Sequence, residues 1–385
     1  MYSNKNSRAS VALGLLVSTL SLSPFAQAYS VKTDFDNDPA TKETLDVYGT
    51  LRLSIDYADS DLGNTPEDPS VGLTDGGMSL SSNTSIIGVR GSYALADQPY
   101  TVVWQLEEKV YPDSDGDDTF RTRDTFLGAK TPVGLFRFGH LNTPFKEMGL
   151  RNQIFVTTVG DPFAILGKSS QSKARLDLRA DNAVKWDFRA GGFQMSTLYS
   201  FGDTPGNNDT EKFYADDNDK QIISTSLRYA IGPVALMGAY DHREEAYGGR
   251  IDAWRVGLRF ESGSFLAGAL YGDVDTDDNV LAGSLARAEY GAYIQQHIVP
   301  QVSIGAQWMH ADESELPLGD DGADQYSLGT YYNPFSRLYL HVVGTITKND
   351  TNGRYGTADF GHGDRVSTVR GGSPFALSVG AQYSF

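Results

Sequence analysis

The sequence predicts an all-β protein, a 16-stranded antiparallel β-barrel that spans a membrane. Three observations favour this fold: sixteen segments alternate apolar and polar residues, the connections alternate between short and long, and aromatic residues gather on the apolar faces. Strict alternation indicates a strand with one apolar face. In a membrane barrel that face meets lipid while the other meets water, so the average hydropathy stays low. The mean hydropathy of −0.34 agrees with this interpretation.

The N-terminus carries the pattern of a secretory signal peptide. Lys5 and Arg8 precede a mostly apolar stretch at 11–22, and Ala26-Gln27-Ala28 offers a small-residue cleavage site. A buried N-terminal helix is the alternative. We therefore expect a cleaved signal peptide at 1–28 and one barrel domain at 29–385. Beyond residue 28 no run of 18 apolar residues occurs, so a membrane-spanning helix is not expected.

The strands follow one another along the rest of the chain. The first is expected at 45–57, where Leu45, Val47 and the odd-numbered residues after them are mostly apolar. The last is expected at 375–385, where Phe385 ends the apolar face. The fourteen alternating runs between them begin near Asn83, Tyr100, Phe120, Leu135, Asn182, Phe193, Gln221, Val234, Ile251, Ser264, Ser284, Val302, Gln325 and Arg337.

The connections between these runs have two lengths. The short connections lie at 95–99, 132–134, 190–192, 231–233, 262–263, 299–301 and 336. The long connections lie at 58–82, 112–119, 143–181, 202–220, 275–283, 312–324 and 351–374. Such an alternation is typical of an up-and-down membrane barrel with short periplasmic turns and long extracellular loops.

Aromatic residues on the predicted apolar faces support a membrane location. Rings with an apolar body and a polar tip favour the headgroup level of a bilayer. An ordinary preference of aromatics for strands is the alternative for each residue taken singly. The residues concerned are Trp104, Trp186, Trp254, Trp308, Tyr229, Phe260, Tyr290 and Phe385.

Composition and motifs argue against most kinds of chemistry. The formal net charge of −17 argues against nucleic-acid binding, and the absence of cysteine excludes disulfides and thiol nucleophiles. Gly167-Lys168-Ser169 lacks the glycine that a phosphate-binding loop needs at 162, and no His-x-x-x-His metal pair or Gly-x-Ser-x-Gly elbow occurs. We expect no enzyme, cofactor or metal site. A membrane-embedded hydrolase with a hidden Ser–His pair is the alternative from another class.

The acidic residues concentrate in five long connections, which together carry a charge of −22: 58–82, 112–119, 202–220, 275–283 and 312–324. Such loops either solvate the surface or bind divalent ions that bridge lipopolysaccharide and gather cations. Asp113, Asp115 and Asp117 could attract such ions, but the spacing does not match a dedicated calcium loop.

Basic residues lie on the predicted polar faces of the strands. Lipid penalises an arginine or lysine at mid-depth by about 2–4 kcal/mol, so these side chains are expected to line water. They are Arg52, Arg90, Arg123, Arg137, Lys185, Arg255 and Arg259. The third long connection, at 144–181, differs from the other loops because its net charge is +2.

Short motifs on these strands resemble the Gram-negative trimeric porins, which are sixteen-stranded outer-membrane channels. The motifs are Val103-Trp104-Gln105-Leu106-Glu107, Arg123-Asp124-Thr125-Phe126-Leu127-Gly128, Phe138-Gly139 and the terminal Tyr383-Ser384-Phe385. Two features depart from the family pattern: His140 follows Gly139, and Gly160-Asp161-Pro162-Phe163 is the nearest match to the Pro-Glu-Phe-Gly-Gly tract of the enterobacterial third loop.

This resemblance implies a homotrimer whose third loop, at 143–181, folds into each barrel as a constriction. It also implies that wall arginines face loop carboxylates across the narrowest point. The candidate constriction residues are Arg52, Arg90, Arg123 and Arg137 on the wall, with Glu147 and Asp161 opposite. The predicted function is passive diffusion of small hydrophilic solutes and ions across the outer membrane, with a weak anion preference. A substrate-selective channel is the alternative within transport.

Overall fold

The computed structural model describes residues 29–31, 42–68, 72–113, 120–172, 174–202, 221–246, 249–277, 284–358 and 361–385. The expected signal peptide at 1–28, most of the acidic connection at 202–220, and both Asp115 and Asp117 lie outside these residues. Within the described residues, no helix is both long and apolar enough to cross a membrane.

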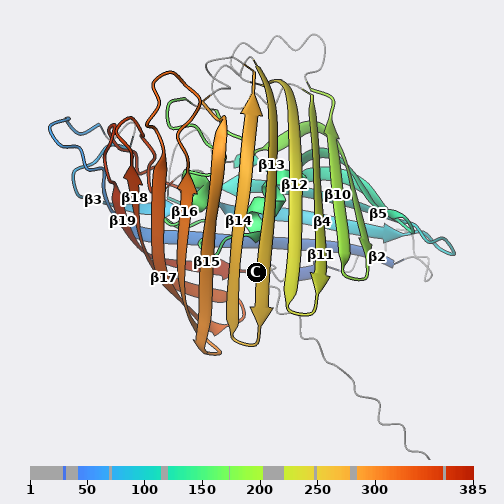
Figure 1. Cartoon of the computed structure of the whole chain (residues 1–385). Helices are drawn as coiled ribbons and strands as arrows, with labels where there is room; N and C mark the ends of the chain where they lie inside the picture. The colour runs from blue at the N-terminus through green and yellow to red at the C-terminus, as the bar shows by residue number, and fades with distance from the viewer. Residues whose placement is uncertain are drawn as a thin grey trace, which may run out of the picture.

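Sixteen strands close into an antiparallel barrel, which confirms the predicted fold class (Figure 1). Each strand pairs with the next along the chain, and β19 pairs with β2 to close the ring. The strands are β2 (Lys42–Asp59), β4 (Ser85–Ala94), β5 (Thr101–Val110), β7 (Thr125–Thr131), β8 (Gly134–Asn142), β9 (Arg179–Ala190), β10 (Phe193–Ser200), β11 (Ile222–Ile231), β12 (Val234–Ala246), β13 (Gly249–Ser262), β14 (Phe265–Thr276), β15 (Arg287–Val299), β16 (Val302–Ala311), β17 (Ala323–Phe335), β18 (Leu338–Asn349) and β19 (Phe375–Ser384).

Three further strands are short: β1 (Tyr29–Val31), β3 (Gly77–Ser82) and β6 (Phe120–Thr122). β3 pairs with the same strand, β2, as β4 does, so it extends β4 beyond a break at Thr84, whose φ is 58°. Our assignment of 77–82 to a long connection was therefore wrong. The alternation was present there, since Met78 and Leu80 point outward and are 73% and 56% exposed.

The outer face of the barrel is an apolar belt bounded by aromatic residues. Large apolar side chains on this face are exposed, such as Ile55 and Leu236. Toward the long-connection end, the rings of Trp254, Tyr271 and Tyr290 lie in a row with centroids 5.5 and 6.1 Å apart. This belt matches a lipid-facing surface, because aromatic residues favour both interfaces of a bilayer.

A second group of aromatic residues lies at the short-turn end of the barrel. The rings of Trp186 and Phe188 are 5.8 Å apart, and the Trp186 indole donates a hydrogen bond to the carbonyl of Val133 in a short turn. Phe385 packs its ring over Gly49, and the two backbones exchange hydrogen bonds of 3.0 and 3.1 Å. A Cβ atom at position 49 would lie 2.4 Å from that ring, so only glycine fits there.

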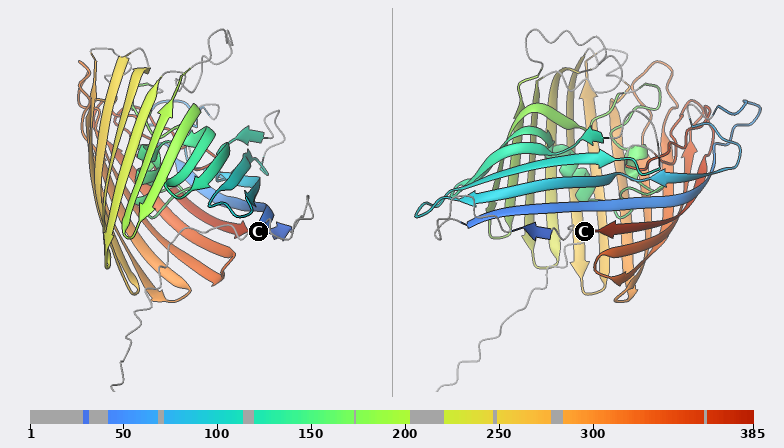
Figure 2. Two further views of the ribbon diagram at one scale, coloured as in Figure 1. Left: turned by 90° about the vertical axis from the view of Figure 1, so that its right-hand side faces the viewer. Right: turned by 180° about the vertical axis from the view of Figure 1, so that it is seen from behind.

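The third long connection contains helical turns that the alternation pattern did not predict. Figure 2 shows α1 (Pro144–Arg151) and the 3-10 turn η2 (Pro162–Ala164) inside the ring of strands. α1 has only eight residues, too few to display a helical apolar stripe. The start of the helix nevertheless has a recognisable sequence signal, because Thr143 caps the helix and Pro144 occupies its first turn. We call residues 143–178 the lumen segment.

Candidate functional site

α1 holds the first part of the lumen segment against the inner face of β10, β11 and β12. The hydroxyl of Thr143 accepts the amide of Lys146, which begins the helix. The amide of Phe145, one of the helix-end donors without an intrahelical acceptor, donates to the hydroxyl of Ser224 on β11 over 3.1 Å. The helix is therefore fastened to the wall at its N-terminus.

The middle of the lumen segment is bound to β16 and β17 by polar side chains. Gln307 accepts the amide of Ile154 over 3.1 Å and donates to the carbonyl of Gly160 over 3.1 Å. The phenol of Tyr331 donates to the carbonyl of Ile154 over 3.1 Å. Backbone groups that would otherwise be unpaired on a loop thus find their partners on the barrel wall.

Apolar side chains complete this attachment. Phe145, Met148 and Leu176 pack with Met237 and Ile251 of the inner face, and all five are almost fully buried. A second cluster joins the lumen segment to β14, β15 and β16 through Phe163, Ile165, Leu166, Leu266, Leu270, Tyr293 and Met309. One side of the inner face is therefore an apolar core rather than a wet surface.

A buried ionic network ties the end of the lumen segment to the same wall. Arg255 on β13 donates to both oxygens of Asp177 over 2.7 and 2.9 Å, and lies 3.3 Å from Glu289. Glu289 also accepts the amide of Gly167 over 2.7 Å and pairs with Arg287 over 3.4 Å. Two cations and two carboxylates balance here, as a buried cluster requires.

Two of the basic residues predicted to line water are buried instead. The side chains of Arg255 and Lys185 are 2% and 0% exposed, because the lumen segment covers them. Lys185 pairs with Glu147 of α1 over 2.6 Å. Alternation correctly placed both residues on the inner face, but it does not reveal what covers that face.

The four predicted wall arginines lie on the inner face between β2 and β8; we call them the arginine wall. Arg90 pairs with Asp46 over 3.3 Å, and its guanidinium lies 5.0 Å from the centre of the Tyr48 ring. Arg52 donates to the side chain of Gln382 over 2.8 Å and to the carbonyl of Thr84 over 2.6 Å.

The other two members of the arginine wall have carboxylate partners on neighbouring strands. Arg123 pairs with Glu107 over 2.8 Å, and Arg137 pairs with Asp187 over 2.6 Å. These wall carboxylates, together with Asp46, were not singled out from the sequence. They alternate correctly for the inner face, but only the strand register shows that they lie beside the arginines.

The two predicted loop carboxylates occupy different settings. Glu147 projects from α1 to Lys185, so it bridges the lumen segment and the wall. Asp161 is buried and accepts the amides of Thr157 and Phe163, which makes it the N-cap of η2. The structure therefore brings Glu147 to a wall cation and gives Asp161 a local role within the segment.

Burial changes the acid–base behaviour of one lysine in the lumen segment. The pKa of Lys146 is lowered well below its ordinary value, first by burial and then by the nearby charges of Arg179 and Arg123. Within the described residues, no group of three or more His, Asp or Glu side chains could hold a metal ion.

A family model described as Gram-negative porin matches residues 9–353. Major outer membrane protein P.IB of Neisseria meningitidis serogroup B is 26% identical over 175 residues, which are 45% of this chain and 49% of that protein. The match thus spans about half the length of the curated relative.

Solved structures share the fold at lower sequence identity. An anion-selective porin from Comamonas acidovorans superposes with a TM-score of 0.68 at 17% identity, over 89% of this chain and all of that one. OmpT of Vibrio cholerae superposes with a TM-score of 0.65 at 16% identity, over 93% of this chain and 100% of that one. OmpF of Salmonella typhi in complex with daunomycin superposes with a TM-score of 0.61 at 14% identity, over 89% of this chain and 98% of that one.

Proposed function

The chain belongs to the Gram-negative porin family, and on this premise we propose that it is a passive diffusion channel in the outer membrane. Small hydrophilic solutes and ions move through it down their gradients, and no bond is made or broken. One observation carries this proposal. A closed barrel turns its apolar face outward, and its lumen holds a fastened segment opposite a charged wall. This arrangement suits a channel that selects the solutes passing through it better than it suits an enzyme.

The constriction in this proposal lies between the lumen segment, within 143–181, and the arginine wall formed by Arg52, Arg90, Arg123 and Arg137. Glu147 contributes a negative charge from the lumen segment, and Lys185 balances it. Asp161 acts by holding the turn at η2. Rings of fixed charge close to a permeating ion select by sign, because a low-dielectric wall screens them little.

The proposed channel prefers anions weakly at moderate salt. Fixed charges in the lumen act at close range, whereas the acidic connections outside the barrel act across water. At 0.1 M salt the Debye length is about 10 Å, so the outer charges are felt weakly. Lowering the salt lengthens that range and moves the preference toward cations.

We extend the proposal to assembly and export. The protein forms a homotrimer in the outer membrane after removal of residues 1–28, and its acidic connections contact lipopolysaccharide through divalent cations. A trimer form of the Vibrio cholerae OmpT structure supports the assembly. The exposed apolar belt supports the membrane location.

Single-channel recording in a planar bilayer tests the proposed function. The purified protein is expected to give stepwise conductance that rises with salt concentration, and reversal potentials in a KCl gradient that report a weak anion preference. Absence of conductance steps, together with ester or phospholipid hydrolysis by the same preparation, would overturn the channel and favour the hydrolase.

A further inference from the structure

A group of four further arginines, none of them in the arginine wall, lies in the lumen at the short-turn end. Arg189, Arg228 and Arg259 come from β9, β11 and β13, and each lies a few residues before a short turn. Arg151 ends α1 and approaches them from the lumen segment. We call these four residues the turn-side cluster.

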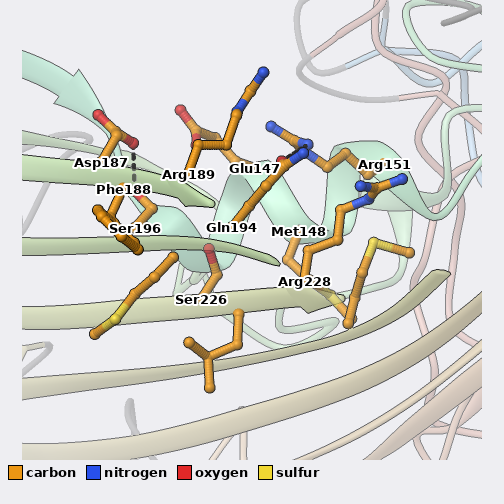
Figure 3. A pocket seen from close by; sticks show the side chains of 13 residues that line it. Glu147, Met148, Arg151, Asp187, Phe188, Arg189, Gln194, Ser196, Ser226 and Arg228 are labelled. Carbon is orange, nitrogen blue, oxygen red and sulfur yellow. Dashed lines mark hydrogen bonds between the residues drawn. The ribbon is translucent and has the colours of Figure 1, made fainter. Parts of the chain in front are cut away.

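The strand register places the turn-side cluster on the inner face. Gln194 of β10 lies opposite Arg189 on one side and Arg228 on the other, so the three side chains share a face. Figure 3 shows Arg151, Arg189 and Arg228 around one recess with Gln194. The cavity volume of this recess is about 70 Å³.

The positive charges of the turn-side cluster are poorly balanced. Arg259 pairs with Glu261 over 3.3 Å and donates to the carbonyl of Arg151 over 3.1 Å. In the part of the chain that the structure describes, the guanidinium groups of Arg189 and Arg228 have no hydrogen-bond or ion-pair partner. Arg228 nevertheless lies within electrostatic reach of the three other arginines.

Two carboxylates border the same recess but are already engaged. Glu147 pairs with Lys185 over 2.6 Å, and Asp187 pairs with Arg137 over 2.6 Å. Their negative charges are balanced by Lys185 and Arg137, which are not members of the turn-side cluster. Glu261 is then the remaining carboxylate that balances the four guanidinium groups. The cluster thus holds an excess of three positive charges around an open recess.

We propose that the turn-side cluster is a second anion-binding station of the pore, selective for a small multivalent oxyanion such as inorganic phosphate. Guanidinium forks match the oxygens of a phosphate group with paired hydrogen bonds, which chloride cannot accept in the same way. Binding also relieves the mutual repulsion of Arg151, Arg189 and Arg228. The inference rests on the proposed channel, because it assigns a station along its path.

Chloride currents through single channels in a planar bilayer provide the test, with inorganic phosphate added to each side in turn. Phosphate is expected to reduce the current saturably, and at lower concentration from one side, since the cluster lies off-centre along the barrel. In the variant Arg189→Gln/Arg228→Gln the half-blocking concentration rises about tenfold or more, because charge-assisted hydrogen bonds are lost.

Arg250→Gln is the matched control, because Arg250 lies at the long-connection end among Asp252, Asp275 and Asp277. Its half-blocking concentration is expected to equal that of the unmodified protein. If the double variant gives no channel, Arg151→Gln alone is used. Arg151 is exposed and belongs to α1, so its replacement leaves the strands of the barrel unchanged. A several-fold rise in half-blocking concentration is expected there.

The outcomes separate this inference from the proposed function. An unmodified protein without conductance steps contradicts the channel itself. A channel whose chloride current ignores phosphate, or whose block is equal in the unmodified protein and in Arg189→Gln/Arg228→Gln, overturns the second station and leaves the channel standing.

Discussion

Three members of the arginine wall form ion pairs with carboxylates of neighbouring strands, and this decides how strong the selectivity can be. Arg90 pairs with Asp46, and Arg123 pairs with Glu107. A cation beside its counter-ion projects a weak field, so the number of wall arginines overstates the positive potential. A weak anion preference follows from such paired charges better than a strong one.

Replacing two wall arginines tests this charge balance. The variant Arg123→Ser/Arg137→Ser leaves Glu107 and Asp187 without their cationic partners, so its reversal potential is expected to shift toward cations. One charge about 8 Å from an ion in water contributes about 0.5 kcal/mol, so each removed charge changes the local ion concentration roughly two- to threefold.

The opposite variant, Glu107→Gln/Asp187→Asn, serves as the control for that shift. It leaves Arg123 and Arg137 uncompensated and is expected to move the reversal potential toward anions. The same sign of shift in both double variants would contradict the pairing that the structure shows.

Lys146 makes the stability of the fold depend on pH. Its pKa in the fold is lowered from 10.5, mainly by burial, so between that lowered pKa and 10.5 the unfolded chain binds more protons. The free energy of unfolding therefore falls as the pH decreases through this window. Lys146→Met is expected to flatten the dependence and to stabilise the protein most at the lower end of the window.

Thermal unfolding in detergent, followed at several pH values below 10.5, measures this effect. Arg151→Met on the same helix is the control, because its side chain is exposed. A stability profile of Lys146→Met that parallels the unmodified protein would contradict a buried lysine with a lowered pKa.

The strands were predictable from the sequence, whereas the path of the lumen segment was not. Alternation reports which face a residue occupies, and it placed Arg255 and Lys185 correctly on the inner face. What covers that face depends on contacts between distant parts of the chain. The sequence did contain one signal that the inner face is covered: apolar residues such as Met237 and Leu266 occupy positions on that face.

The candidate site was predictable in its residues but not in its pairs. The polar alternation identified Arg90, Arg123 and Arg137, while their partners require the strand register, which a pattern of period two does not specify. The role of Asp161 at the constriction stays a prediction. An Asp before Pro-Phe-Ala also has the pattern of a helix cap, and the side chain of Asp161 accepts the amides of Thr157 and Phe163.

The buried network around Asp177 is expected to hold the lumen segment in place. Asp177→Asn leaves the Arg255 and Arg287 charges facing Glu289 alone, and breaking a buried pair costs about 3–5 kcal/mol. The segment should then loosen, so single-channel currents become noisier and more variable in amplitude.

Asp312→Asn is the control for the loosened segment, because Asp312 is a half-exposed surface carboxylate paired with His310. Its current traces are expected to match those of the unmodified protein. Steady, unchanged currents in Asp177→Asn would show that the ionic network does not hold the segment.

The closed barrel and its apolar belt determine how the protein behaves in detergent. A closed ring leaves no sheet edge to open, and every strand finds its hydrogen bonds within the wall. We expect an SDS-resistant oligomer that becomes a monomer on boiling, seen as a mobility shift on a gel. A detergent-solubilised monomer with full conductance would contradict the proposed trimer.

In the proposed channel, water and ions pass along the arginine wall. The chain contains no cysteine, so a single introduced thiol can report access to the lumen without background. Arg90 suits this purpose because its side chain is 42% exposed on the inner face. Ile87, three residues earlier on the same strand, points to the outer face and is 40% exposed.

The most direct test is therefore to record single channels of Arg90→Cys and Ile87→Cys while adding a negatively charged, water-soluble thiol reagent. Arg90→Cys is expected to lose chloride current and to shift toward cation selectivity, because a fixed negative charge then lies in the path. Ile87→Cys should not respond, since its thiol faces lipid. An unresponsive Arg90→Cys, or an equal response of both variants, would contradict a water-filled path along this wall.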